Sequence, residues 1–387
     1  RNNYFSLNFT FKRDAAKYVS FEYTEPEEIE TKNRTERFIS NLNANNIGVN
    51  KIIETLIRGF LVIILPFKFH LEKTIDIFSF FAHLKKSIAP LIGKSENWIL
   101  EKSGVYERRV SKIDVDQMGA IAGKEALGNS GQPDLIINAS GVPKQTIPDT
   151  STFFQKEMGF EGIPSFSIHA TCLSFITAFH AASSLIESKV YKRILIISSD
   201  RGTRGRNFHE PESASLLGDG AAAVILEPSK ESEKSKLLYF HMNTWPSGAN
   251  LTEVRGGGTN KHPQDKHTTT EDNLFSMDGP GIYKIARKHV YKMMLKTLKN
   301  TGLEKKDIDW IIPHQASRKA VEAYVSIGGF DKDRVINIVS KYGNCVAASV
   351  PMALTIAIQE NRVKRGDLVL LVGTGAGLSA ACALIKY

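Results

Sequence analysis

The chain has 387 residues, of which 42% are hydrophobic and 24% charged, and its formal net charge is +9. This is the composition of a folded globular protein, and no apolar run is long enough to span a bilayer. Three cysteines are too few for a disulfide framework and indicate a reducing, cytoplasmic compartment. The positive charge indicates either an ordinary solvated basic surface or an acidic partner, and no zinc-type spacing or basic–aromatic module supports nucleic acid.

The first 58 residues have no counterpart elsewhere in the chain, and we expect them to form an N-terminal extension. Within it, the charge-mixed stretch 25–37 is expected to be helical or loosely ordered. The most apolar segment of the chain, residues 60–67, contains a proline near its end and predicts a buried strand.

A weak internal repeat organises the rest of the chain into two halves, residues 59–228 and 229–387. In the first half we predict strands at 134–140, 165–168, 193–200 and 221–227, and a helix at 175–187. In the second half we predict strands at 309–314, 335–339, 367–372 and 380–386, with helices at 317–326 and 347–359. Residues 229–275 are polar and rich in glycine, and we expect a strand-and-loop excursion that forms a lid or rim.

Near-continuous apolar strands that alternate with helices predict an α/β fold whose sheets are covered on both faces. Two copies of such a unit imply five layers, α/β/α/β/α, built from two pseudo-symmetric halves. A site would then lie between the copies.

Cys172 lies where the predicted strand 165–168 leads into the predicted helix 175–187. Unpaired N–H groups and the positive end of the helix dipole favour a thiolate there, and a thiolate attacks carbonyls and thioesters. Taken alone, a cysteine flanked by Ala170 and Leu173 is more often a small buried hydrophobic residue.

Three further features follow strand ends in the second half. His314 stands between a strand and a helix, where the sites of α/β proteins collect, although a satisfied buried histidine is the alternative. Asn344 lies on the turn that the repeat equates with the Cys172 turn, but asparagine is also common in turns and N-caps. The glycine-rich stretch 373–377 is either a plain bend or a source of backbone N–H groups for a ligand.

Together, a thiol, an imidazole, an amide and an N–H-rich turn suit acyl transfer through a thioester. The backbone N–H groups of Cys172 and Ala376 could hold the carbonyl oxyanion. His314 and Asn344, as hydrogen-bond donors, could stabilise an enolate formed on a second substrate.

These motifs, with segments 98–109, 217–224, 312–316 and 342–349, resemble the ketoacyl synthase III group of the thiolase superfamily, the 3-oxoacyl-[acyl-carrier-protein] synthases. The resemblance implies a thiolase-like fold and an acyltransferase of fatty-acid, specialised lipid or polyketide biosynthesis, with no bound cofactor or metal. Cys172 would be acylated by an acyl-coenzyme A or acyl-carrier protein. His314 and Asn344 would bind malonyl-carrier protein and promote its decarboxylation, and the carbanion would give a 3-oxoacyl thioester.

The resemblance also implies a homodimer and a set of binding residues. Trp98 and Lys102 match positions that hold coenzyme A, and Ile147 matches a position that shapes the acyl pocket at the dimer boundary. Ser317 and Gly375 are further candidates for substrate binding. Because carrier proteins are acidic, four basic residues are candidates for docking them, with ordinary helix surface as the alternative: Arg287, Lys288, Arg318 and Lys319.

Two departures from the family pattern favour a specialised relative. Ser174 stands where a glycine is usual, and Pro211 replaces an arginine that some members use for coenzyme A, which leaves the acyl carrier open. One alternative is an acyltransferase that moves the acyl group to an alcohol or amine, and another is a non-catalytic partner subunit. A papain-like protease shares the order Cys, His, Asn, but its local cysteine signature is missing.

Overall fold

The computed structural model describes residues 7–8, 10–11, 17–19, 83–84, 88–229 and 235–387. The strand expected at 60–67 and the stretch 25–37 lie outside these residues. The chain divides into two compact units, residues 22–83 and residues 1–21 with 84–387. The second unit contains the repeat from residue 84 onward, whereas residues 59–83 of the predicted first half belong to the other unit.

The first half is built on a sheet in the order β2-β9-β8-β6-β7, with β3 also paired to β9. Its long strands, β6 (Leu135–Asn138), β8 (Ile194–Arg201) and β9 (Asp219–Glu227), are almost fully buried along their length. The edge strand β7 (Ser165–Ser167) and β8 both run parallel to β6, whereas β9 is antiparallel to β8. The short strands β2 (Thr10–Phe11) and β3 (Lys17–Val19) pair with β9 on its other side.

The second half repeats this plan in a sheet of order β1-β10-β15-β14-β13. β13 (Trp310–Pro313) is parallel to β14 (Leu368–Gly375), and β15 (Ser379–Lys386) is antiparallel to β14. β10 (Lys236–Thr244) pairs with β15 and with β1 (Leu7–Asn8). The expectation that 229–275 lies outside the repeated body was therefore wrong for β10, which is an interior strand of this sheet.

The strand predicted at 335–339 is also absent. Only one bridge joins Val335 to Ile311, and helix α12 (Val339–Tyr342) follows soon after. The reason is Gln315, whose side-chain amide donates to the Ile336 carbonyl and accepts from the Ile338 N–H. The side chain therefore supplies the partners that a neighbouring strand would otherwise provide.

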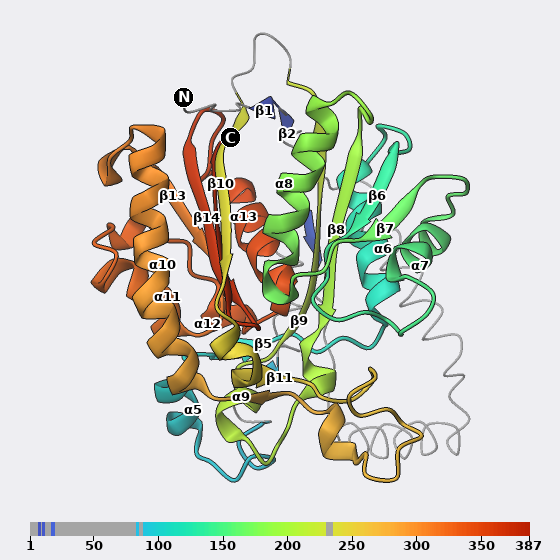
Figure 1. The fold of residues 1–387 in the computed structure, drawn as a ribbon, viewed down its shortest axis with the longest axis vertical. Coiled ribbons are helices and arrows are strands. Elements are labelled where there is room, and N and C mark those ends of the chain that lie inside the picture. The colour runs from blue at the N-terminus through green and yellow to red at the C-terminus, as the bar shows by residue number, and fades with distance from the viewer. Residues whose placement is uncertain (1–6, 9, 12–16, 20–82, 85–87, 230–234) are drawn as a thin grey trace, which may run out of the picture. The chain divides into compact units, whose positions relative to one another are not determined.

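Helices lie between and outside the two sheets, which gives the predicted five layers (Figure 1). Between the sheets lie α8 (Ser174–Glu187) and α13 (Ser349–Gln359), and ten consecutive residues of α13, from Ser349 to Ile358, are buried. A helix that is apolar on every side belongs in such a central layer. One core cluster joins these helices to both sheets.

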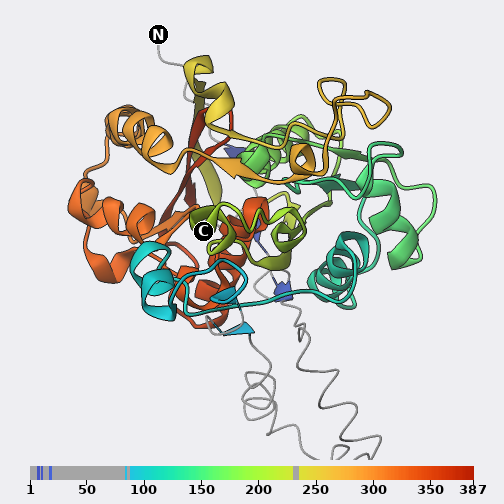
Figure 2. The ribbon, with the colours of Figure 1, turned by 90° about the horizontal axis from the view of Figure 1, so that it is seen from below.

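The helices of the two outer layers occupy corresponding positions on the two sheets, although their sequences differ. On the first sheet lie α6 (Val115–Leu127) and α7 (Thr150–Met158), and on the second lie α10 (Gly279–Thr301) and α11 (Arg318–Ser326). Figure 2 shows the orange helices α10 and α11 at one side and the blue-green α6 and α7 at the other. The remaining short elements are β4 (His83–Leu84), α5 (Glu96–Lys102), β5 (Glu107–Arg108), α9 (Pro211–Ala214), β11 (Thr252–Glu253) and β12 (Ser276–Met277). None of the described helices is long and apolar enough to cross a membrane.

Candidate active site

Two turns with the same backbone structure pack against each other. The first, η1 (Thr171–Leu173), carries Cys172 and leads into α8, and the second, η7 (Val346–Ala348), follows Asn344 and leads into α13. Each is a 3-10 turn whose first residue has a positive φ, 52° at Thr171 and 50° at Val346. A β-branched residue is strained in this region, and such strain is concentrated at functional sites. The repeat predicted that the cysteine turn corresponds to the turn 341–344, but the turn that matches it is η7, so that Ala347 corresponds to Cys172 and Asn344 lies just before the matching turn.

A serine braces each turn from the start of its helix. The Ala170 N–H donates to Ser174 Oγ at 2.9 Å, and the Cys345 N–H donates to Ser349 Oγ at 3.0 Å. Ser174 Oγ also donates to the Thr171 carbonyl at 2.7 Å. Because Ser174 is fully buried, its hydroxyl closes the turn where the family usually has glycine.

The end of β14 packs directly against the cysteine turn. A Cβ at Gly375 would lie 2.5 Å from Thr171 Oγ1, and one at Gly373 would lie 2.8 Å from His314 Cβ and 3.3 Å from Leu173 Cδ2. These glycines are required because β14 passes between His314 and the cysteine turn. The glycine-rich stretch is therefore not a plain bend: β14 continues through Gly375, and the turn that contains Ala376 begins after it.

Asn344 is fixed on both its backbone and its side chain. Its N–H donates to the Leu216 carbonyl at 2.8 Å, and its carbonyl accepts from the Gly218 N–H at 3.0 Å. Its Oδ1 accepts from the Val346 N–H at 2.9 Å. This hydrogen bond identifies which atom of the Asn344 side-chain amide is the oxygen. The NH2 group therefore faces the other way and is left to donate.

His314 follows β13 and is 5% exposed. Its backbone N–H donates to the Val372 carbonyl at 2.8 Å, and burial lowers the pKa of its imidazole to about 4. The ring is therefore neutral at physiological pH and carries one N–H to donate. Its Nδ1 is buried with no hydrogen-bond partner among the described residues, so His314 is not a satisfied structural histidine.

Cys172 is a half-buried free thiol, and its electrostatics overturn one prediction. Burial, and then the charge of Asp200, raise the pKa of the Cys172 thiol to about 12, although a backbone N–H acts to lower it. Desolvation of the thiolate therefore exceeds the stabilisation expected from the helix N-terminus. Before substrate binds, Cys172 is a thiol and His314 a neutral imidazole.

Asp200 is a residue of this site that the sequence did not point to. It is fully buried near the end of β8, and its Oδ1 accepts from the N–H groups of Gly141 at 2.8 Å and Val142 at 3.0 Å. Its Oδ2 accepts from the Ala348 N–H in η7 at 3.1 Å. One carboxylate thus ties a loop of the first half to the turn after Asn344, and burial raises its pKa to about 7. The signal in the sequence was only a single acidic residue near the end of an apolar strand.

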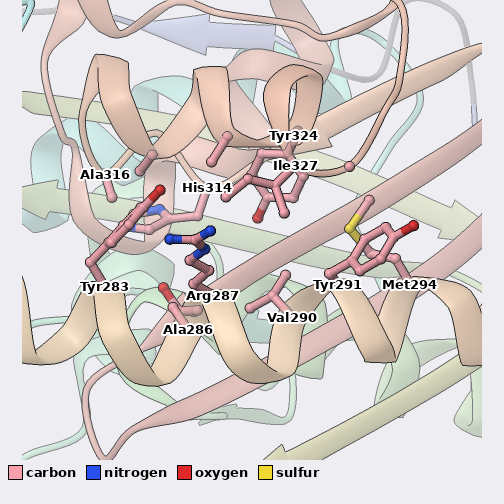
Figure 3. Close-up of a pocket in the computed structure, with 14 residues that line it drawn as sticks. Tyr283, Ala286, Arg287, Val290, Tyr291, Met294, His314, Ala316, Tyr324 and Ile327 are labelled. Atoms are coloured by element: carbon pink, nitrogen blue, oxygen red, sulfur yellow. The ribbon is translucent and has the colours of Figure 1, made fainter.

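A cavity of about 80 Å³ opens beside His314, between α10 and α11 (Figure 3). Arg287, one of the four candidates for carrier docking, lines this cavity, and its side chain points toward His314. Lys288 and Lys319 are exposed, and Arg318 is ion-paired with Glu322 at 3.8 Å. The basic candidates are therefore grouped on the two helices that flank the cavity.

The other predicted binding residues lie apart from this cavity. Trp98 packs on a small cluster that includes Ile99 and Ala214, and Lys102 is 3.8 Å from the Glu212 carboxylate. Ile147 is 80% exposed. Ser317 caps α11 by accepting the Ala320 N–H at 3.2 Å. Among the described residues, no group of three or more His, Cys, Asp or Glu side chains could hold a metal ion.

Comparison with known proteins agrees with this arrangement. Residues 166–246 match the family model "3-Oxoacyl-[acyl-carrier-protein (ACP)] synthase III", and residues 298–387 match its C-terminal model. A beta-ketoacyl-[acyl-carrier-protein] synthase III of Natranaerobius thermophilus is 31% identical over 309 residues, 78% of this chain and 94% of the relative. The chain belongs to the 3-oxoacyl-[acyl-carrier-protein] synthase III family.

Other relatives and solved structures of this family extend the match. A beta-ketoacyl-[acyl-carrier-protein] synthase III of Neisseria meningitidis is 30% identical over 311 residues, 78% of this chain and 93% of the relative. The crystal structure of the Aquifex aeolicus 3-oxoacyl-[acyl-carrier-protein] synthase III has a TM-score of 0.72 and 29% identity, and the match covers 79% of this chain and 96% of that one. Xanthomonas campestris OleA, at 20% identity, a TM-score of 0.69 and coverage of 79% and 94%, shares the fold. The predicted thiolase-like fold is confirmed.

Proposed function

We propose that this protein is a condensing acyltransferase of the 3-oxoacyl-[acyl-carrier-protein] synthase III type. It takes an acyl group onto Cys172 and condenses it with a malonyl-carrier thioester with loss of CO2. The observation that carries the proposal is the packing of the cysteine turn against η7 and against the strand end beside His314. This packing supports the proposal, because the turn that carries Cys172 contacts the turn after Asn344 and the strand end that lies against His314.

In the first half-reaction the Cys172 sulfur attacks the carbonyl carbon of an acyl thioester. A new C–S bond forms, the old one breaks, and the proton of Cys172 leaves with the departing thiol. Because the pKa of Cys172 is about 12, proton loss accompanies attack instead of preceding it. The backbone N–H groups of Cys172 and Ala376 are the candidates for holding the oxyanion.

In the second half-reaction the bond between the malonyl α-carbon and its carboxylate breaks, and CO2 departs. The electron pair remains as an enolate whose oxygen accepts from the His314 N–H and the Asn344 NH2 group. Both donors are neutral and held in place before the charge develops, which is the arrangement that stabilises a transition state most. The α-carbon then attacks the acyl carbonyl, the C–S bond to Cys172 breaks, and the thiolate takes a proton from solvent.

We infer that an acyl carrier protein is the partner that delivers the malonyl group. Lys288, Arg318 and Lys319 give the entrance beside His314 a positive charge that suits an acidic carrier. The acyl donor is either coenzyme A or a carrier protein. Glu212 lies close to Lys102 and would compete with a phosphate for its charge, which favours the carrier.

We also propose a homodimer joined through β7. This strand is an edge of the first sheet, and edge strands are natural sites of pairing with another chain. Phe166 on the strand, and Val142 and Ile147 in the loops after β6, are exposed apolar residues. A cytoplasmic location stays a prediction from the three free cysteines.

The test is intact mass of the protein after incubation with acyl thioesters of several chain lengths, followed by malonyl-carrier protein. We expect one acyl adduct, absent from Cys172→Ala, that malonyl-carrier protein discharges as a 3-oxoacyl product. If no thioester labels Cys172, the proposed enzyme fails and a non-catalytic subunit becomes the better account. If the adduct discharges only to an alcohol or amine, the acyltransferase alternative replaces condensation.

A further inference from the structure

The cavity between α10 and α11 has a charged end beside His314 and a mainly aliphatic and aromatic far end (Figure 3). At the first end His314, Arg287 and Tyr283 point into the same space. The far end is formed by Val290, Met294 and Ile327 together with Tyr291 and Tyr324, and none of these side chains is charged. A ligand that fits this space has a polar head and an aliphatic tail.

Small residues on α11 and in the segment just before it create the apolar part. Ala316, Ala320 and Ala323 line the cavity on one side, and Ala286 faces them from α10. The spacing of 320 and 323 puts both methyl groups on the same face of the helix. A larger side chain at Ala320 would fill the space that these residues leave open.

Arg287 supplies the only positive charge in the lining. It has no hydrogen bond or ion pair with any other described residue, so its guanidinium is available to an anionic group beside His314. A carboxylate suits it, since guanidinium binds carboxylates through two parallel hydrogen bonds.

We propose that this cavity binds a malonyl-type extender that carries an aliphatic chain on its α-carbon. The inference rests on the proposed function. The thioester oxygen would lie at His314, the α-carboxylate at Arg287, and the chain along α10 and α11 toward Met294. Condensation then gives a 2-alkyl-3-oxoacyl thioester and CO2, by the same bond changes as with malonate.

The size and lining of the cavity favour the alkyl chain of such an extender. One water-sized group needs about 10–15 Å³ on this measure, so a cavity of about 80 Å³ holds roughly five to eight methylene-sized groups. Cys172 is not among the lining residues, so the chain belongs to the second substrate and not to the acyl group on the cysteine. At the far end an alkyl chain would pack on Val290, Met294 and Ile327 and needs no hydrogen-bond partner.

The test compares two N-acetylcysteamine thioesters, of malonate and of hexylmalonate, as extenders for acylated enzyme. We expect kcat/KM to favour hexylmalonate by at least tenfold. Ala320→Phe should lower this ratio at least tenfold, and Ala323→Leu serves the same purpose if the first variant does not fold. Ser326→Leu, on the exposed face of α11, should leave the ratio unchanged. Arg287→Gln should raise KM for both extenders, because both carry the carboxylate.

A photoreactive diazirine at the end of the alkyl chain gives a readout that does not need turnover. We expect cross-links to peptides of α10 and α11 in the wild-type protein. If malonate is condensed but hexylmalonate is rejected, or if cross-links map elsewhere, the inference is overturned while the proposed function stands. If neither extender is condensed, the proposed function fails, and the cross-link map still decides whether this cavity binds the chain.

Discussion

The reactivity of Cys172 toward iodoacetamide should be unusually low at neutral pH. A pKa of about 12, against about 8.5–9 for an ordinary cysteine, lowers the thiolate fraction at pH 7.5 about a thousandfold. A more basic thiolate is also more nucleophilic, with a Brønsted coefficient of about 0.4–0.5, which recovers roughly 20- to 30-fold. We therefore expect alkylation about 30- to 50-fold slower than that of a free cysteine at this pH.

The assay is intact mass at timed intervals between pH 6 and 10.5. Cys345 and Cys382 are buried, and Cys172→Ala measures any reaction at them. The logarithm of the rate should rise with pH at a slope close to one, with no plateau up to pH 10. A plateau between pH 6 and 8 would mean that the thiolate is preformed by the helix N-terminus, and the electrostatic account would be refuted.

Three further predictions concern stability. Asp200 accepts hydrogen bonds from three backbone N–H groups, whereas the asparagine of Asp200→Asn has only one acceptor atom. This variant should lower the free energy of unfolding, measured in urea, by about 3 kcal/mol. A variant as stable as the wild type would contradict the role of Asp200 in joining the two loops. Ser174→Gly loses both hydrogen bonds of the hydroxyl and should cost about 1–2 kcal/mol in the same titration, and an unchanged midpoint would count against the brace. His314 has a folded pKa of about 4 against about 6.5 unfolded, so the unfolded chain binds more protons in this window and the protein gains stability as pH rises through it. His314→Asn should remove about 2 kcal/mol of the difference in unfolding free energy between pH 5 and 7.5, and an undiminished difference would refute the buried neutral imidazole.

The regular elements were predictable where the hydrophobic pattern was strong. The strands that became β6, β8, β9, β14 and β15 are apolar over most of their length, and α13 is apolar all round. β10 was harder, because Lys236–Thr244 is only partly buried and contains histidine, methionine and asparagine. The segment 335–339 has the pattern of a strand, but the side chain of one glutamine, Gln315, takes the place of a neighbouring strand.

The residues and turns of the site could be predicted from the sequence, but the protonation states of its side chains could not. A strand, a turn and a helix can be read locally, so the repeat paired the segment around Cys172 with the segment around Asn344, although Ala347 is the residue that corresponds to Cys172. The pKa of Cys172 depends on how many protein atoms surround the sulfur and on Asp200, which lies 28 residues away. Likewise, the direction of the Asn344 amide depends on one backbone N–H, and the cavity beside His314 depends on which faces of two helices meet. None of these follows from local sequence.

The central claim is that His314 and Asn344 act on the second substrate and Cys172 on the first. The most direct test measures both half-reactions in Asn344→Ala: the rate at which an acyl thioester labels Cys172, and the rate at which malonyl-carrier protein discharges the adduct. Losing one preorganised donor to an enolate costs about 10²- to 10³-fold in rate. We predict that discharge falls at least a hundredfold more than acylation does. If the two rates fall by the same factor, Asn344 acts only by holding the turn, and the account is contradicted.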